Sequence, residues 1–438
     1  MIPATSVAAS LSAPLRRRIL LSSFACSPLW GSEPGVGWQW LRRLARDHDV
    51  TLLTHSYSRD HLEPALTRED VVVRVVYVQA PAFGAHPHKQ LNSRLYYVWW
   101  QFWVRSVARK LLAAEHFDLV HHLTWGTLRF PCLLGGLGVP LVMGPLGGGE
   151  AAPLHLFAGL PWRVRLQEAI RLATLRLSHI DPLATWGPRR ACLVMCKSEE
   201  SLRALPPSVR ARAIVLPEIG SPPIDPRARG VDHAGAVRSF RLFFAGRLLG
   251  VKGLSLALGA LQILVQQGHA TTLDIAGDGP LRRHLEEEVA TRSLGHHVRF
   301  LGALPREQLM DRYREADLFV FPSLHDSSGN VVLEALSRGL PVVCLDLGGP
   351  RLYVDDSCGV VVRTAGYDRT GVEQALAEAI GKLVAHPARV AAMSRAAFEH
   401  AARQSWDEVV AQAYAEIGAR VGWSGGAETQ PVPHGAAP

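Results

Sequence analysis

Residues 316–350 constrain the fold more than any other part of the chain. The apolar run Leu318–Phe321 is followed by a polar loop over 323–330, a short helical stretch, Val331–Arg338, and a second apolar run, Leu340–Leu345. Two parallel strands joined by a helix form a βαβ unit, which packs with a right-handed crossover. This order predicts an α/β chain with a parallel sheet, whose ligands bind beyond the carboxyl ends of the strands.

Two acidic residues flank the start of this helix. Asp326 lies in the loop, and Glu334 lies eight residues further on, in the helix. The free N–H groups at a helix start favour an anion such as phosphate, whereas two carboxylates beside it are better suited to hydroxyl groups, as on a ribose and a sugar. The alternative is a solvated loop aspartate and a helix-surface glutamate. The candidate phosphate-binding residues at the helix start are Ser328, Gly329, Asn330 and Val331.

A second loop supplies positive charge. It follows the apolar run Phe240–Phe244 and contains Gly246, Arg247 and Lys252. An arginine forks onto phosphate oxygens and a lysine adds a mobile point charge, so this pair predicts a diphosphate site. The alternative is two solvated surface cations. Gly277, in a Gly-x-Gly-Pro turn after the next apolar run, is a further candidate ligand-binding residue, because such turns let the backbone approach a ligand closely.

In this order, the motifs resemble the donor-site signature of retaining glycosyltransferases of family four, which have the GT-B fold. The family's E-x(7)-E followed by G-x-P-V-V corresponds to Asp326–Glu334 and Gly339–Val343, with aspartate as the first acid, and its G-R-x(4)-K-G corresponds to Gly246–Gly253. The resemblance implies that the first acid contacts the donor sugar, the second holds the ribose hydroxyls, and Arg247 and Lys252 bind the pyrophosphate. These two cations and the first acid are therefore candidate catalytic residues.

The length of 438 residues predicts two domains. A proline-rich segment over 217–239 separates two αβ halves. The family resemblance implies two Rossmann-like domains facing across a cleft, with a C-terminal helix crossing back to the first domain. We expect an N-terminal acceptor-side domain over 15–217, completed by about 405–423, and a C-terminal nucleotide-sugar-binding domain over 240–404.

The first domain contributes two further sets of candidates. A glycine-rich strand-to-helix turn contains Gly31, Gly35 and Gly37, and such turns let the backbone approach a ligand closely. The run Phe117–His122 predicts a strand that ends in two histidines. Adjacent strand residues point to opposite faces, so at most one naturally faces the cleft. The register of the family favours His121, near the transferred sugar, and the alternative is a hydrogen-bonded histidine pair at a strand end.

The net charge limits the classes of partner that the chain is expected to bind. The net charge is +8, from 47 Lys and Arg against 39 Asp and Glu, which suits an anionic substrate, an anionic membrane surface or nucleic acid. The sequence carries no aromatic-basic RNA motif or basic recognition helix, so we expect no nucleic-acid partner. Residues 89–115 and 161–180 are basic and amphipathic and predict peripheral membrane contact; the alternative is core helices with a basic outer stripe.

Cysteine usage and the N-terminal residues bear on the compartment. The six cysteines are scattered and form no C-x-x-C pair, which favours buried free thiols in a reducing cytosol. The residues after Met1 do not have the pattern of a signal peptide. We expect a cytoplasmic protein, or one held at the inner face of the plasma membrane.

The resemblance implies a retaining, metal-independent transferase without a cofactor. Its donor is expected to be a UDP- or GDP-sugar, and its acceptor a carbohydrate or a lipid-linked molecule in surface polysaccharide or lipopolysaccharide assembly. Two alternatives remain open. One is a sugar-nucleotide epimerase of the same fold, which needs no acceptor. The other is a non-catalytic partner that holds a polysaccharide assembly complex at the membrane surface.

Overall fold

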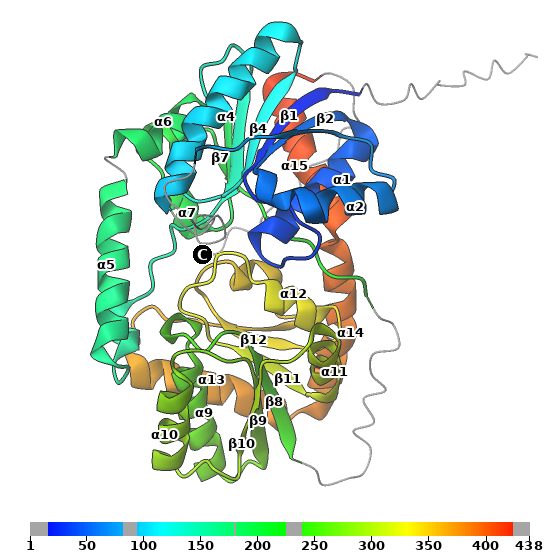
Figure 1. Ribbon diagram of the computed structural model, residues 1–438. Helices are drawn as coiled ribbons and strands as arrows, with labels where there is room; N and C mark the ends of the chain where they lie inside the picture. Colours follow the sequence, from blue (N-terminus) through cyan, green and yellow to red (C-terminus); the bar gives the residue numbers. More distant parts are fainter. Residues whose placement is uncertain (1–15, 82–93, 179–180, 225–238, 424–438) are drawn as a thin grey trace, which may run out of the picture.

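Two parallel β-sheets form the centres of two domains (Figure 1). The computed structural model describes residues 16–81, 94–178, 181–224 and 239–423. Central strands such as Leu119–Thr124 and Leu318–Phe321 are buried along their whole length, as expected for parallel strands covered by helices on both faces. The predicted α/β class with two Rossmann-like domains is confirmed.

The N-terminal sheet has seven strands in the order β3-β2-β1-β4-β5-β6-β7, and all neighbours pair in parallel. Its strands are β1 (Arg18–Ser23), β2 (Asp49–Thr54), β3 (Arg74–Tyr77), β4 (Leu119–Thr124), β5 (Leu141–Leu146), β6 (Leu193–Cys196) and β7 (Ala213–Val215). The helices of this part are α1 (Glu33–Asp47), α2 (Arg59–Arg68), α4 (Arg94–Ala114), α5 (Trp162–Ser178), α6 (Pro182–Arg190), α7 (Glu199–Arg203) and α8 (Pro207–Arg210), with short 3₁₀ helices η1 (Ser56–Ser58) and η2 (Leu154–Phe157).

The C-terminal sheet has six strands in the order β10-β9-β8-β11-β12-β13, again all parallel. Its strands are β8 (Phe240–Ala245), β9 (Thr271–Ala276), β10 (Val298–Gly302), β11 (Leu318–Phe321), β12 (Val342–Leu345) and β13 (Gly359–Val362). Its helices are α9 (Leu254–Gln266), α10 (Arg282–Thr291), α11 (Arg306–Glu315), α12 (Asn330–Leu336), α13 (Arg369–Val384) and α14 (Pro387–Arg403), with η3 (Gly250–Lys252) and η4 (Pro350–Tyr353); α15 (Trp406–Val421) follows.

Each sheet has a switch point, which is the place where the order of strand addition reverses. It lies between β1 and β4 in the first sheet and between β8 and β11 in the second. In open parallel sheets, ligands bind outside the carboxyl ends of the strands at this point. The loops after β8 and β11 are those that carry the predicted cationic and acidic residues.

Helix α4 falls within the basic segment 89–115, of which residues 89–93 lie outside the described part of the chain. Tyr97 and Trp100 are fully buried in the core on one face of the N-terminal sheet. Phe102 and Trp103 are 51% and 40% exposed. The helix is therefore mainly a core element, which is the alternative that its sequence allowed, with a small apolar patch outside.

The chain crosses between the domains twice, and the two crossings lie side by side. The backbone N–H of Ser221, after β7, donates to the carbonyl of Gln404 at 2.7 Å. Ser405 then caps α15 by accepting from the N–H of Glu408, and α15 returns to pack beside α1 in the N-terminal domain (Figure 1). Arg46 of α1 pairs with Asp407 of α15 at 2.9 Å. The predicted return of the C-terminal helix is confirmed.

Within the parts of the chain that the structure describes, no helix combines the length and the apolar character needed to cross a bilayer.

Candidate active site

The loops after β8 and β11 are joined by hydrogen bonds to the carbonyl of Val251. It accepts from the N–H of Leu324 at 2.8 Å and from the hydroxyl of Ser323 at 3.1 Å. Gly253 permits this approach, because its φ is +67° and a Cβ there would lie 1.8 Å from the carbonyl oxygen of Pro322. The two predicted loops therefore form one unit at the switch point of the C-terminal sheet.

Lys252 and Asp326 are brought together in this unit. The ammonium donates to Asp326 Oδ2 at 2.5 Å, and Oδ1 accepts from the N–H groups of Ser328 and Gly329 at 3.1 and 2.9 Å. Burial opposes ionisation, but Lys252 and these amides together hold the pKa of Asp326 below its ordinary value. The carboxylate thus fixes the loop and the lysine.

Arg247 is the exposed cation of the same unit. Its guanidinium forms no hydrogen bond or ion pair with any residue that the structure describes. A guanidinium offers five N–H donors in a planar fork. At the carboxyl edge of the sheet, the N–H donors of this side chain are available for an anionic ligand.

Gly246 and Gly277 follow the neighbouring strands β8 and β9, and their backbones are in close contact. The N–H of Gly246 donates to the carbonyl of Ala276 at 3.0 Å. A Cβ on Gly277, whose φ is +137°, would lie 1.9 Å from the carbonyl oxygen of Gly246. These glycines let the two loops close against each other, and they keep side chains out of the edge where Arg247 is presented.

Glu334 lies in α12 and faces α11. It accepts from Tyr313 Oη and from Arg306, each at 3.3 Å. Burial raises the pKa of Glu334, although the positive charge of Arg306 acts to lower it. The carboxylate is thus positioned by two long hydrogen bonds. Asn330, beside Gly329 at the start of α12, is exposed, and Val331 is half-buried.

The N-terminal domain contributes a buried charged cluster that the sequence did not single out. Lys197 directly follows β6, and its ammonium lies 2.7 Å from Glu218 Oε1 and 3.3 Å from Glu33 Oε1. The side chains of Lys197 and Glu218 are only 4% and 3% exposed. Although burial alone would lower it, the pKa of Lys197 is raised by the two carboxylates, so the lysine is charged.

This cluster and its neighbours contact loops of the C-terminal domain. Ser328 donates its hydroxyl to Glu218 Oε2 at 2.8 Å. His325 lies 3.5 Å from the buried carboxylate of Glu150, and the N–H of Gly348 donates to Glu200 at 3.2 Å. The carboxyl edges of both sheets therefore meet at one interdomain site.

Glu150 is itself held in place by small polar groups. One carboxylate oxygen accepts from the hydroxyls of Ser198 and Ser201 at 2.7 and 2.8 Å, and the other accepts from the N–H of Gly148 at 2.9 Å. Burial opposes ionisation, but His325 and these donors lower the pKa of Glu150 to about 2. A fixed negative charge thus faces the loop that carries Asp326.

The structure contradicts the placement predicted for His121. The side chain is fully buried, its Nε2 donates to the carbonyl of Gly144 at 2.8 Å, and its Nδ1 accepts from Tyr414 at 3.0 Å. Burial lowers the pKa of His121 to about 4. His122 is also buried and bonds to Tyr97 and Ser22. Each histidine is thus hydrogen-bonded inside the domain, which is the alternative that the sequence allowed.

The glycines of the first loop are also placed differently from the prediction. The helix begins at Glu33, so Gly35 and Gly37 lie within α1. Gly37 is buried, and a Cβ there would lie 2.6 Å from the carbonyl oxygen of Ala25. It lets α1 pack against its own loop and does not face the interdomain site, whereas Gly31 is exposed with open space around it.

A weak signal for the missed residues was present in the sequence. Lys197 stands directly after the apolar run Leu193–Cys196, at the carboxyl end of a strand, which is where ligand-binding residues of such sheets gather. Glu218 lies in the segment after β7 and shows no pattern of its own. The assembled site offers cations for an anion and carboxylates for hydroxyl groups.

Comparisons with known proteins show the family to which the chain belongs. Residues 233–403 match the family model described as glycosyl transferases group 1. Over 432 residues the chain is 34% identical to a D-inositol 3-phosphate glycosyltransferase of Salinispora tropica, and the alignment covers 91% of this chain and 84% of the relative.

Two solved structures show the same fold at low identity. Sucrose-phosphate synthase from Thermosynechococcus elongatus superposes with a TM-score of 0.60 at 20% identity, covering 92% of this chain and 100% of that one. Anabaena Alr3699/HepE in complex with UDP and glucose gives a TM-score of 0.57 at 19% identity, covering 92% and 99%. The two-domain architecture is that of GT-B glycosyltransferases.

Proposed function

Because the chain belongs to the family of glycosyl transferases group 1 and is therefore an enzyme that transfers glycosyl groups, we propose that it moves a sugar from a UDP- or GDP-sugar to a carbohydrate or lipid-linked acceptor, with retention at the anomeric carbon. The C-terminal domain binds the donor, and the N-terminal domain receives the acceptor. The proposed pathway is surface polysaccharide or lipopolysaccharide assembly, at the cytoplasmic face of the membrane.

The observation that carries this proposal is the pair of cations at the switch point of the C-terminal sheet. Arg247 has no partner among the described residues, and Lys252 is held at 2.5 Å by Asp326. In the proposed complex, both contact the donor diphosphate and stabilise the charge that develops on it as the bond to the sugar breaks. These cations supply the neutralising charge that a divalent ion would otherwise give, so we propose donor binding without a metal.

The proposed reaction is a dissociative departure of the nucleoside diphosphate. The acceptor hydroxyl attacks the anomeric carbon from the face that the diphosphate leaves, and the leaving phosphate takes the hydroxyl proton. Glu334 holds the ribose hydroxyls, and Asp326 orients Lys252 beside the donor sugar. Because His121 is buried inside the N-terminal domain, it has no part in this scheme.

The donor is tested by thermal unfolding in the presence of UDP-, GDP- and ADP-sugars. A ligand that binds only the folded chain stabilises it by about 2.7 kcal/mol at a hundred times its dissociation constant. We expect at least one uridine or guanosine diphosphate sugar to raise the unfolding temperature, and the free nucleosides, which lack the diphosphate, to leave it unchanged. If none of the three donor classes stabilises the chain, the proposed donor site is wrong.

The same donor then separates transfer from epimerisation. A transferase consumes the donor only when an acceptor is added, whereas an epimerase converts the nucleotide sugar alone. Uridine nucleotides come first in this assay, because Anabaena Alr3699/HepE was solved with UDP and glucose. Conversion of the donor at full rate without acceptor would favour the epimerase.

We also propose that α5 touches an anionic membrane surface. Trp162, Leu166, Ile170 and Leu177 are 65%, 48%, 55% and 60% exposed, and at about 100° per residue they fall within one narrow stripe of the helix. The exposed residues Arg163, Arg165 and Arg176 flank it. An apolar stripe bordered by arginines is suited to the interface of a bilayer that contains acidic lipids.

Removing charge beside this stripe should weaken vesicle binding. In Arg165→Gln/Arg176→Gln we expect the partition coefficient on anionic vesicles to fall about 30-fold, at about 1 kcal/mol per basic residue, while transfer to a water-soluble acceptor stays unchanged. Co-sedimentation measures the partition. Val72→Ser, which alters an apolar residue 81% exposed elsewhere on the surface, is the matched control. Equal binding by the parent and the double variant would remove α5 from the contact.

A further inference from the structure

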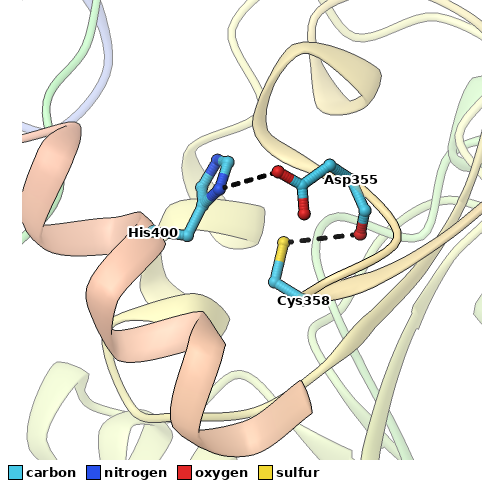
Figure 2. Close-up of side chains that lie close together, drawn as sticks. All are labelled: Asp355, Cys358 and His400. Atoms are coloured by element: carbon cyan, nitrogen blue, oxygen red, sulfur yellow. Dashed lines mark hydrogen bonds and ion pairs between the residues drawn. The ribbon is translucent and has the colours of Figure 1, made fainter. Parts of the chain in front are cut away.

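Three side chains with metal-binding atoms meet outside the interdomain site. Asp355 and Cys358 belong to the turn between η4 and β13, and His400 belongs to α14 (Figure 2). One ligand atom from each lies within 4.8 Å of the others. The carbonyl of Cys358 accepts from the N–H of Val342, the first residue of β12. The cluster therefore lies at the amino edge of the sheet, opposite the edge that carries Arg247 and Lys252.

The imidazole and the thiol are poorly satisfied by the protein around them. His400 Nε2 is buried and has no partner within the described chain, and Nδ1 has only a long contact of 3.4 Å to Asp355 Oδ2, although buried polar atoms nearly always have a partner. The thiol of Cys358 is fully buried and has only long contacts, 3.8 and 3.7 Å, to the carbonyls of Tyr353 and Asp355. Burial of donors and acceptors without partners costs free energy, which a bound ion would relieve.

The carboxylate is oriented toward the imidazole. Asp355 Oδ1 accepts from the N–H and the hydroxyl of Ser357 at 2.9 and 2.5 Å. This leaves Oδ2, which lies 3.4 Å from Nδ1 of His400. The turn thus fixes one oxygen and presents the other to the ring and the thiol.

We propose that Asp355, Cys358 and His400 bind one Zn²⁺ ion, with water as the fourth ligand. Thiolate, imidazole and carboxylate are the ligands of tetrahedral zinc, and bond lengths of about 2.0–2.3 Å place ligand atoms about 3.3–3.8 Å apart. Side-chain rotations that move these ligand atoms by up to about one ångström bring them from their present distances to this spacing. The soft thiolate disfavours Mg²⁺ and Ca²⁺. The thiol proton passes to solvent on binding, and the two anionic ligands then balance the charge of the ion.

Such an ion joins two parts of the C-terminal domain. It ties the turn before β13 to α14, whose chain continues into α15 and the return to the N-terminal domain. Because the cluster lies at the opposite edge of the sheet from the proposed donor site, the zinc stabilises the fold and takes no part in the transfer reaction. This inference does not rest on the proposed function, so either can fail alone.

Cobalt titration of the full chain, freed of metal by a chelator, tests the site. We expect Co²⁺ to give thiolate-to-cobalt charge-transfer absorption and the intense visible bands of a tetrahedral ion, saturating at one ion per chain and displaced by Zn²⁺. Zn²⁺ should also raise the temperature of unfolding, because it binds the folded state. A chain that shows no charge-transfer absorption at saturating Co²⁺ overturns the proposal.

Three variants locate the ion. Cys358→Ser should abolish the charge-transfer absorption, whereas Cys192→Ser, which alters a half-buried thiol of the N-terminal domain, should keep it. Loss of an outer-shell partner weakens metal binding about 10–100-fold. His400→Gln should weaken it by more than this, because the imidazole is itself a proposed ligand. This variant also serves as the test if Cys358→Ser does not fold. Unchanged cobalt spectra in Cys358→Ser, or unchanged affinity in His400→Gln, rule out these ligands.

Discussion

Arg247→Ala should lower the rate of glycosyl transfer about 10²-fold or more, since losing one preorganised group that stabilises developing charge costs about 2.7–4 kcal/mol. The guanidinium is exposed and unpaired within the described chain. Its removal should therefore change the free energy of unfolding by less than about 0.5 kcal/mol. Initial rates at saturating donor and acceptor measure the first quantity, and urea unfolding measures the second.

Arg283→Ala is the matched control for this variant. Arg283 also lies in the C-terminal domain, is 92% exposed, and among the described residues pairs with Glu287 of its own helix, at 2.9 Å. The substitution removes the same charge away from the switch point, so the rate of transfer and the free energy of unfolding should both match those of the parent. Normal turnover in Arg247→Ala would show that the diphosphate is bound elsewhere.

Lys252→Ala is a less selective test of the same site. Its ammonium is the partner of Asp326, so truncation removes one positive charge and leaves a partly buried negative charge, 16% exposed, beside the proposed diphosphate. The loop fixed by the N–H groups of Ser328 and Gly329 could then rearrange as well. Arg247, whose side chain has no partner within the described ranges, separates the contribution to catalysis from the contribution to structure.

The meeting of the loops after β8 and β11 could be predicted from the sequence because each of these segments is local. Gly246–Gly253 and Asp326–Glu334 are short segments, each placed by the strand that precedes it. Parallel strands that lie side by side bring their following loops to one edge. The pairing of Lys252 with Asp326, 74 residues apart, follows from β8 and β11 being neighbours.

The position of His121 could not be predicted in the same way. Strand alternation indicates that adjacent histidines point to opposite faces, but it does not say what covers each face. The covering residue is Tyr414 of α15, which is 293 positions away in the chain. A helix that returns from the end of the sequence thus converts a strand-end histidine into a core residue.

The charged cluster around Lys197 was missed for a related reason. Its members come from the start of α1, the end of β6 and the segment after β7, and none of these segments shows a pattern that pairs it with the others. Only the packing of the two domains brings Glu218 to Ser328. Long-range pairing of charges is therefore visible in the structure and absent from local sequence.

Lys197→Met should lower the free energy of unfolding by about 3–5 kcal/mol near neutral pH, because removal of one member of a buried ion pair leaves an uncompensated charge. Glu218, 3% exposed, and Glu33 lose their common cation. Urea unfolding followed by tryptophan fluorescence measures the loss. Lys382→Met, at an exposed lysine of α13, is the control and should stay within about 0.5 kcal/mol of the parent.

The pH dependence tests the cause of this loss. Burial raises the pKa of Glu218, and Lys197 opposes that rise in the parent. Without the ammonium, the folded-state pKa rises further above that of the unfolded chain, about 4.3. A group of this kind loses its contribution to stability as the pH rises through its folded-state pKa. The deficit of Lys197→Met should therefore be largest at neutral pH and shrink as the pH falls toward the ordinary glutamate range.

The double variant Lys197→Met/Glu218→Gln completes the cycle. With the buried carboxylate replaced by a neutral amide, the remaining acid of the cluster is Glu33, which is 26% exposed, so the double variant should be more stable than Lys197→Met alone. A coupling energy between the two changes of about 0.5–3 kcal/mol is typical of contacting residues. If the two losses instead add and do not change with pH, then water reaches Glu218, and Lys197 and Glu218 do not act as a buried ion pair.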